Sequence, residues 1–261
     1  MEILLPILIL GALGGIFGAG LAFASRKLAV HNDLRLEKIM GLLPGANCGA
    51  CGSAGCFGFA EAVLKGDLPP DACRASDEKV QHEIAGILGR KLEKGAQRTA
   101  VLHCRGGKSA ADKYIYAGLK DCLAAASLLG GPKKCASGCI GLGSCVTVCP
   151  FKAISMGEDG LPRVDKDRCR SCGKCVIVCP KRLFTLETDQ HKVYVACRSS
   201  DNAARKRGYC KSACIACRLC EKTCKFGAVK VENNLAVIDY AKCTACLECV
   251  KACPVKVIKI L

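Results

Sequence analysis

Cysteine dominates the chemistry that this sequence can carry, because 24 of its 261 residues are Cys. Such a density is typical of a secreted disulfide scaffold or of an intracellular metal protein, and the Cys spacing separates the two. Here the run C-x2-C-x2-C-x3-C recurs, which is the spacing of thiolate ligands for [4Fe–4S] clusters. We therefore expect one-electron transfer through clusters, a process that needs no catalytic side chain.

The runs form two tandem ferredoxin-like modules between Cys135 and the C-terminus. In a two-cluster ferredoxin, the first three Cys of one run and the fourth Cys of the other run bind the same cluster. This rule groups the cysteines of the second module crosswise, as Cys214, Cys217, Cys220 and Cys253 for one cluster and Cys224, Cys243, Cys246 and Cys249 for the other. Zinc ribbons present two separated pairs per metal instead, so runs of four with Cys-Pro endings favour iron.

The first module departs from this pattern, because Leu142 stands where a central Cys is expected. We assign its two clusters to Cys135, Cys139, Cys145 and Cys179, and to Cys149, Cys169, Cys172 and Cys175, with Cys135 the most irregular ligand. A second departure is Lys225, which replaces the Pro that follows the last Cys of the other runs. Ligation does not depend on that Pro, but the missing ring suggests a different local turn.

A fifth group, Cys48, Cys51, Cys56 and Cys73, has its own spacing and begins in a Gly-rich loop that allows close approach to a cluster. One further [4Fe–4S] cluster is expected here, and a zinc knuckle is the alternative because it shares the CxxC start. The prediction is thus about five cubanes in all. For the remaining Cys104, Cys122, Cys197 and Cys210 we expect mostly buried thiols, with a sixth cluster as the alternative that their wide spacing disfavours.

The formal charge of +16 overstates the charge of the loaded protein, because a cubane with four thiolates carries roughly −2. Five clusters would leave roughly +6, so nucleic-acid binding need not be invoked, and the basic surface could attract an acidic ferredoxin or anionic lipid. Arg205-Lys206-Arg207 is expected to be a solvated loop, with docking of an acidic carrier as the alternative. Gly107-Lys108-Ser109 lacks the first Gly of a P-loop, so no nucleotide site is expected.

Residues 3–25 carry no charge, and as a helix rising about 1.5 Å per residue they would extend roughly 35 Å, enough to cross a bilayer. Arg26 and Lys27 follow directly, which places the C-terminal domains in the cytoplasm. A cleaved signal peptide is the alternative, but Glu2 is the only charge before the apolar run. We expect a single-pass protein of the cytoplasmic (inner) membrane.

Together these features predict an α+β fold with a single N-terminal transmembrane helix. Its five parts are a transmembrane anchor (1–27), a small helical [4Fe–4S] domain (28–75), a helical and strand connector (76–130) and two tandem bacterial-ferredoxin-like modules (131–196 and 197–261). Ser76 can begin a connector helix that runs to about Lys94, and a strand is expected from Thr99 to Cys104. Hairpins are expected over 153–164 and 228–238, between the Cys runs of each module.

The segment GANCGACGSAGC closed by Cys73, the apolar N-terminus and the tandem modules together resemble the B subunit, the iron–sulfur subunit, of the Rnf ion-translocating complexes over essentially the whole chain. The resemblance implies an electron-transfer subunit that accepts electrons from reduced ferredoxin, within a ferredoxin:NAD oxidoreductase coupled to Na⁺ or H⁺ movement. Its implied partners are soluble ferredoxin, as donor or acceptor, and the other membrane and peripheral subunits of such a complex. The stretch GCIGLGSC (138–145) also looks like the longer members of this family.

Two other classes of protein remain as interpretations. A polyferredoxin-like subunit of another membrane oxidoreductase, such as a hydrogenase, would share the two modules but would not need the Cys48 to Cys73 group. A basic zinc protein that binds nucleic acid is opposed by the membrane helix and by the Cys-Pro runs. Iron and sulfide analysis would separate this last class from the others.

Overall fold

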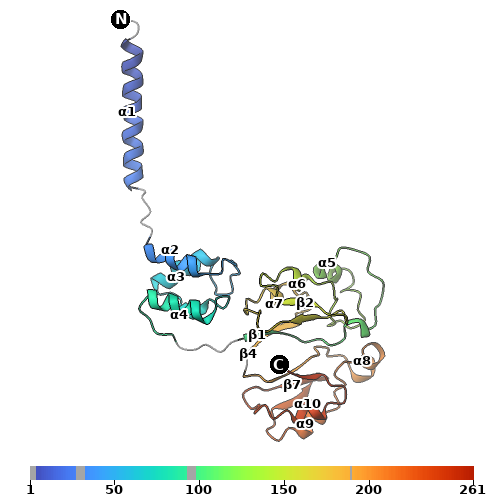
Figure 1. The fold of residues 1–261 in the computed structure, drawn as a ribbon. Coiled ribbons are helices and arrows are strands. Elements are labelled where there is room, and N and C mark those ends of the chain that lie inside the picture. Colours follow the sequence, from blue (N-terminus) through green and yellow to red (C-terminus); the bar gives the residue numbers. More distant parts are fainter. Residues whose placement is uncertain (1–3, 28–32, 93–97, 189) are drawn as a thin grey trace.

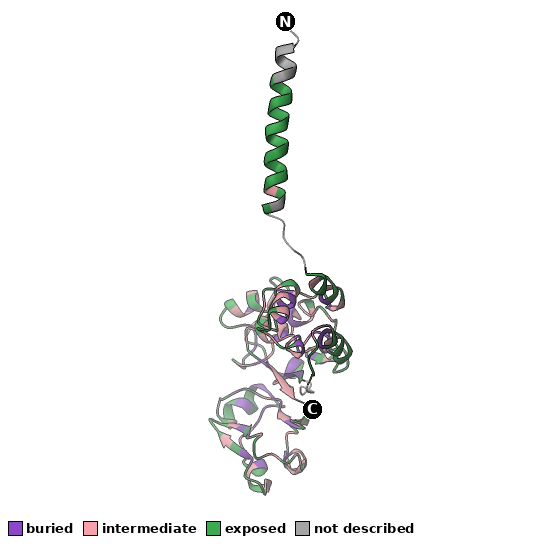
Figure 2. Ribbon diagram, turned by 90° about the vertical axis from the view of Figure 1, so that its left-hand side faces the viewer, coloured by how far each residue is buried: buried purple, intermediate pink, exposed green. Residues whose placement is uncertain are grey.

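A computed structural model describes residues 4–27, 33–92, 98–188 and 190–261. The N-terminal helix α1 (Leu4–Lys27) stands apart from the folded domains that follow it (Figure 1). Its described side chains are almost all exposed, whereas buried residues gather in the domains (Figure 2). Over the described residues, no helix meets the combined length and apolarity required for crossing a membrane. The span expected over 3–25 begins outside these residues.

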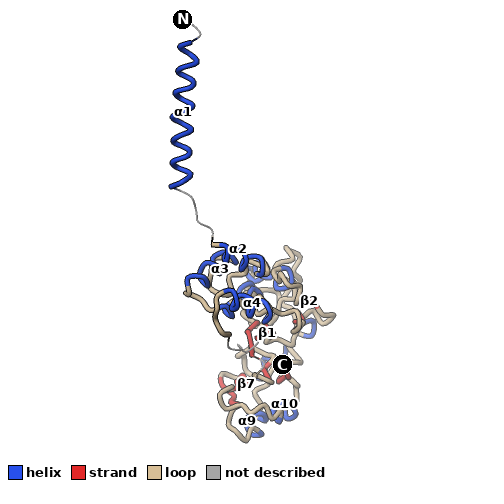
Figure 3. Tube along the Cα trace, turned by 60° about the vertical axis from the view of Figure 1, so that its left-hand side comes forward, coloured by secondary structure: helices blue, strands red, loops and turns tan. Residues whose placement is uncertain are grey.

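A helical domain follows, built from α2 (Leu34–Leu42), α3 (Cys56–Lys65) and α4 (Glu78–Ile87), with a 3-10 turn η1 (Pro70–Ala72) between the last two (Figure 3). Asp33 begins α2, because its carboxylate accepts a 2.8 Å hydrogen bond from the amide of Arg35. The three helices share a core, to which α2 contributes Ile39, α3 contributes Phe59 and Val63, and α4 contributes Ile84. This core supports the loop that carries the Cys48 to Cys73 group.

The helix expected over 76–94 is shorter than predicted and packs in the helical domain. It ends at Ile87, and Gly89 then adopts a φ of 64°, a left-handed conformation that terminates helices. Ser76 does not cap it; the Ser76 hydroxyl instead donates to the carbonyl of Cys73 at 2.8 Å. Residues 93 and 94 of the prediction lie outside the described residues.

The first ferredoxin-like module contains β1 (Arg98–Leu102), η2 (Gly107–Ser109), α5 (Cys122–Ser127), α6 (Ser144–Thr147), β2 (Ile154–Met156), β3 (Pro162–Val164), α7 (Lys174–Val178) and β4 (Phe184–Thr188). β1 pairs antiparallel with β4, with Ala100 opposite Leu186, and β2 pairs antiparallel with β3. The expected hairpin over 153–164 is confirmed, and the strand expected from Thr99 begins and ends slightly earlier.

The second module repeats this topology with β5 (Val193–Val195), α8 (Ala203–Tyr209), α9 (Leu219–Thr223), β6 (Val229–Glu232), β7 (Leu235–Ile238), α10 (Glu248–Ala252) and β8 (Ile258–Ile260). β5 pairs antiparallel with β8, and β6 with β7, which confirms the hairpin expected over 228–238. Each module is thus an inner hairpin and an outer two-stranded sheet made from the two ends of the module.

A few specific contacts join the domains. Between the modules, the Nδ1 atom of His103 lies 2.8 Å from the carbonyl oxygen of Val195. Between the helical domain and the first module, Arg170 and Asp77 form an ion pair of 2.7 Å, and Phe151 packs against both cores. These contacts link the three domains that carry the Cys groups.

Candidate metal centres

Cysteine takes the place of apolar side chains in the cores of both modules. The core of the second module includes four buried thiols, from Cys214, Cys220, Cys249 and Cys253. The core of the first includes three, from Cys145, Cys169 and Cys175. The thiols line cavities that a metal centre would fill, and metal binding would then contribute to folding.

The second module brings its eight run cysteines into two groups that each draw on both runs. One cavity is lined by Cys214, Cys217, Cys220 and Cys253. In the other group, burial raises the pKa of the Cys249 thiol, and the neighbouring thiolates of Cys243, Cys246 and Cys224 raise it further. This interlocked arrangement has the chemistry and ligand number of two cubane sites.

A common turn places the fourth sulfur of each run. The Sγ atom accepts a hydrogen bond from the backbone N–H four residues later, at 3.4 Å for Cys149 and Cys179 and at 3.3 Å for Cys253. The residue before each donor, which is Lys152, Arg182 or Lys256, has a φ of 49°. Such N–H donors stabilise a thiolate, and they are one of the means by which a protein sets cluster potentials.

Cys224 adopts the same turn although Lys225 replaces the proline. Gly227 takes the left-handed position with a φ of 60°, and its amide donates to the Cys224 carbonyl at 3.2 Å. Burial acts to raise the pKa of the Cys224 thiol, but backbone amides, including that of Ala228, lower it overall. The missing Pro therefore does not change the turn after Cys224. Gly227 reaches the required left-handed conformation without strain.

The regular half of the first module gathers Cys149, Cys169, Cys172 and Cys175 around one cavity. Burial raises the pKa of the Cys175 thiol to about 12, and the neighbouring Cys thiolates add to the shift. Burial is the main cause that raises the pKa of the Cys172 thiol, and the thiolate of Cys48 raises it further. The Cys group of the helical domain therefore lies next to this one.

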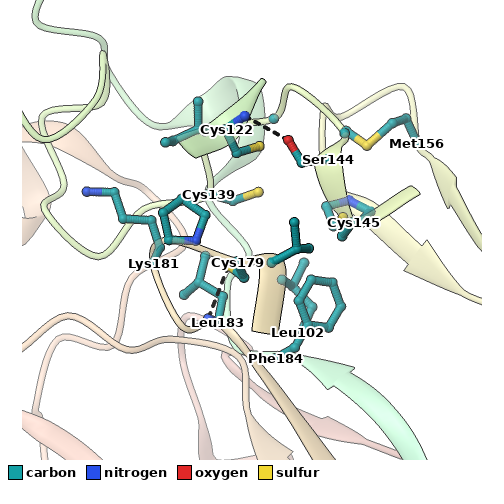
Figure 4. Close-up of a pocket in the computed structure, with 16 residues that line it drawn as sticks. Leu102, Cys122, Cys139, Ser144, Cys145, Met156, Cys179, Lys181, Leu183 and Phe184 are labelled. Carbon is teal, nitrogen blue, oxygen red and sulfur yellow. Dashed lines mark hydrogen bonds between the residues drawn. The ribbon is translucent and has the colours of Figure 1, made fainter. Parts of the chain in front are cut away.

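The irregular half of the first module has a different fourth cysteine from the one assigned by sequence. Its cavity is lined by Cys122, Cys139, Cys145 and Cys179, whose side chains surround a common space in Figure 4. Burial raises the pKa of Cys145 to about 11, and Cys122 and Cys179 are the thiolates that raise it further. Cys135 does not line this cavity.

Cys122 is held at this cavity by a short hydrogen-bond chain. The Ser144 hydroxyl accepts the Cys122 N–H at 2.7 Å (Figure 4). The same hydroxyl donates to a carboxylate oxygen of Asp121 at 2.9 Å. The other oxygen of Asp121 accepts the Ala124 amide at 2.8 Å, which caps α5. The segment before Cys135 thus supplies the thiol that Leu142 cannot. The gap at Leu142 was the one sequence signal that an outside ligand was needed.

Cys135 lies with three of the cysteines left over by the sequence assignment. Burial raises the pKa of Cys210, and the thiolates of Cys104, Cys197 and Cys135 raise it further. Burial also raises the pKa of the Cys135 thiol, and the thiolates of Cys104 and Cys197 raise it further. Cys135 and Cys210 also share one buried cluster, against which Cys197 packs. A sixth group of four thiols therefore lies between the modules, with two cysteines from each.

The members of this sixth group occupy equivalent positions in the two modules. Cys104 follows the last residue of β1 by two positions, and Cys197 follows the last residue of β5 by two. Cys135 precedes the first run cysteine, Cys139, by four positions, as Cys210 precedes Cys214. The two modules thus contribute matching pairs, which sequence spacing conceals because the members lie so far apart along the chain.

In the helical domain, Cys73 is buried and the other three cysteines of its group pack against the same core. The Asn47 side chain accepts the Cys56 amide at 2.8 Å, which fixes the start of α3. Gln81 of α4 donates to the Cys73 carbonyl at 3.0 Å, so both ends of the group are tied to helices. Burial raises the pKa of the Cys73 thiol.

Within the described part of the chain, no three His, Cys, Asp or Glu side chains form a group suited to a single metal ion. In a cubane each thiolate binds a different iron atom, so its four ligands surround a larger space than the ligands of one ion. Cluster ligands must also be deprotonated, so loading of thiols with raised pKa values releases protons. The four-thiol groups and their apolar walls fit [4Fe–4S] clusters in these respects.

Family models and curated relatives match the sequence of this chain. An Fe–S cluster model matches residues 43–75, a 4Fe-4S dicluster domain 134–183, and 4Fe-4S binding domains 211–227 and 236–259. The chain is 40% identical to the B subunit of the ion-translocating oxidoreductase complex of Methanosarcina acetivorans, over 97% of both chains. It is 44% identical to the B subunit of the Na⁺-translocating ferredoxin:NAD⁺ oxidoreductase complex of Acetobacterium woodii, over 98% of this chain and 77% of the relative. It is 38% identical to the B subunit of the proton-translocating ferredoxin:NAD⁺ oxidoreductase complex of Clostridium ljungdahlii, over 98% and 92% respectively. The chain therefore belongs to the family of B subunits of the Rnf-type ion-translocating oxidoreductase complexes.

Proposed function

We propose that this protein is the iron–sulfur electron-transfer subunit of an Rnf-type ferredoxin:NAD oxidoreductase complex that couples electron flow to ion translocation. One observation carries the proposal: six groups of four neighbouring thiols account for all 24 cysteines of the chain. The names of the relatives support ferredoxin as the redox partner and the other subunits of such a complex as neighbours. The protein has no separate catalytic site in this proposal.

The proposed cofactors are six [4Fe–4S] clusters, one more than the sequence spacing indicated. Four ligand sets are those assigned from sequence, and the other two exchange Cys135 for Cys122 and take up the remaining cysteines. The six sets are Cys48, Cys51, Cys56 and Cys73; Cys122, Cys139, Cys145 and Cys179; Cys149, Cys169, Cys172 and Cys175; Cys104, Cys135, Cys197 and Cys210; Cys214, Cys217, Cys220 and Cys253; and Cys224, Cys243, Cys246 and Cys249.

In this mechanism, the clusters supply reversible one-electron carriers. The protein holds them with thiolates, excludes water with apolar walls such as Leu183 and Phe184, and directs backbone N–H groups at the sulfurs of the fourth ligands. The N–H donors stabilise negative charge on sulfur, so each site can accept an electron without proton transfer to a side chain.

The neighbouring thiols indicate an order in which electrons would pass between the cluster sites. The helical-domain group adjoins the Cys149 group through Cys48 and Cys172, and that group adjoins the Cys122 group through Cys175 and Cys145. The Cys122 group in turn adjoins the intermodule group, because the Cys139 amide donates to the Sγ atom of Cys104 at 3.4 Å. The intermodule group would then pass electrons between the first module and the second.

We further propose that the apolar N-terminus anchors the protein in the cytoplasmic membrane, with the cluster domains in the cytoplasm. The uncharged residues 3–25 and the basic pair that follows them support this assignment. The test is membrane fractionation of the full chain and of a chain lacking residues 1–27. Recovery of both forms in the soluble fraction would contradict the anchor.

The main test is anaerobic purification of the full chain, with iron, sulfide and zinc counted per protein and EPR of the dithionite-reduced sample. About 24 iron and 24 sulfide are expected, with signals of reduced cubanes. About twenty of each would contradict the count of six clusters, and zinc without sulfide would overturn the electron-transfer function.

A further inference from the structure

Lys206 differs from the two arginines beside it. The sequence predicts a solvated loop for Arg205-Lys206-Arg207, but in the structure Lys206 is 0% exposed while both arginines are exposed. The segment is helix α8, whose Asn202 cap accepts the Arg205 amide at 2.8 Å. Helical spacing turns Lys206 and Tyr209 to the inner face together, so the expectation of a solvated loop is wrong for Lys206.

The ammonium group of Lys206 is buried among backbone carbonyls. Its Nζ atom donates to the carbonyl oxygen of Cys214 at 2.9 Å and to that of Asn234. Among the ion pairs of the described residues, none includes Lys206. Lys133 provides a contrast, because this nearly buried lysine pairs with the carboxylate of Asp112 at 3.0 Å.

A fully buried ammonium without an anion is costly, since desolvation of the charge is not repaid by neutral carbonyls alone. The Cys214 loop offers the missing anion, because a cubane bound by four thiolates carries a net negative charge. The last hydrogen bond of α8 joins the Cys210 amide to the Lys206 backbone carbonyl at 2.8 Å. Lys206 is therefore bonded to one residue of the intermodule Cys group through its backbone, and to one residue of the Cys214 group through its ammonium.

We propose that Lys206 sets the reduction potential of the cluster held by Cys214, Cys217, Cys220 and Cys253. This inference rests on the proposed function. One-electron reduction makes the cluster one charge more negative; the electron comes from a neighbouring cluster or from ferredoxin, and no proton moves. A fixed buried ammonium stabilises this reduced form and raises the potential. Lys206 thus acts on this cluster through its charge and is not one of its ligands.

The test compares three variants of the full chain in anaerobic EPR redox titrations. Lys206→Met removes the charge, Lys206→Gln removes the charge but keeps a hydrogen-bond donor, and Lys206→Arg keeps the charge. We expect Met and Gln to lower the midpoint potential of one cluster, by about tenfold in its redox equilibrium constant or ~59 mV for one electron, while Arg stays near wild type. Lys230→Met is the matched control, because Lys230 is exposed on β6 and solvent screens its charge.

Each outcome has a distinct meaning. Wild-type protein without cubane EPR signals would defeat the proposed function itself. Intact clusters with unchanged potentials in Lys206→Met and Lys206→Gln would overturn only the role of Lys206. If Lys206→Met loses a cluster, the midpoint potential measured in Lys206→Gln decides whether the charge of Lys206 matters. Loss of the cluster in all three variants, or an equal shift in Lys206→Arg, would assign Lys206 a purely structural role and overturn the inference.

Discussion

The two ferredoxin-like modules share a topology but differ in how they complete one ligand set. In the second module, Cys217 occupies the centre of its run and lines the cavity with Cys214 and Cys220. In the first, Leu142 holds the equivalent position, and Cys122 reaches the cavity from a separate helix. The difference shows that a thiol from outside a run can line the cavity where the run itself lacks a cysteine.

Removal of iron should have the largest effect, and it should destabilise both modules. Because buried thiols form much of each core, we expect the iron-depleted chain to lose the protection of β4 and β8 against hydrogen exchange. The measurement is hydrogen exchange of the chain before and after anaerobic chelation. A module that kept its protection without iron would show that its apolar core suffices, and the modules would then differ in stability as well as in ligand supply.

Loss of Cys122 should remove one cluster from the first module, as loss of Cys217 does from the second. We expect Cys122→Ala and Cys217→Ala each to lose about four iron atoms per protein. Adding Leu142→Cys to Cys122→Ala should restore iron, because it rebuilds the regular run of the second module.

The control for this rescue is Leu142→Cys alone, which should keep the wild-type iron content. Full iron in Cys122→Ala without the second change would show that Cys122 is no ligand.

Replacement of Cys135 should resemble replacement of Cys210, its counterpart in the second module. Each Ala variant is expected to lose about four iron atoms, and the double variant no more than either one, because both thiols serve the same cluster. Iron analysis and EPR of the three proteins provide the measurement. Additive losses of about eight iron atoms would place the two cysteines in different clusters.

Ser144→Ala should have a smaller effect, confined to the first module. It leaves the Cys122 amide without its acceptor and one oxygen of Asp121 without its donor, so we expect a loss of roughly 1–2 kcal/mol in stability. Thermal unfolding of the loaded protein checks this. Thr147→Ala on the exposed face of α6 is the control, and equal losses in both variants would argue against the hydrogen-bond chain.

Lys225→Pro should have the smallest effect, because the turn after Cys224 already matches the turns that contain proline. We expect a gain of about 0.4–1 kcal/mol from the less flexible unfolded chain. Thermal unfolding again gives the measurement, with Lys222→Ala on α9 as the control. A clear loss of stability would mean that the Cys224 turn differs from the other three in its conformational demands.

Much of this architecture follows from local sequence. The inner hairpins and the crosswise grouping in the second module depend on short spacings that a fixed topology converts into neighbours. Cys122 and the intermodule group could not be assigned in this way, because folding joins segments up to about a hundred residues apart along the chain. The burial of Lys206 was equally hidden, since its inward direction depends on the exact phase of a short helix within a basic stretch.

The cysteine group shared by the modules also affects how the protein is made. Cys104 and Cys135 leave the ribosome well before Cys197 and Cys210, so this site stays incomplete until the second module has been synthesised and has docked. A chain that stops short keeps a pair of thiols without partners, open to oxidation and to capture by repair or degradation systems. The group can therefore assemble only in a chain that has been synthesised past Cys210 and has docked its two modules.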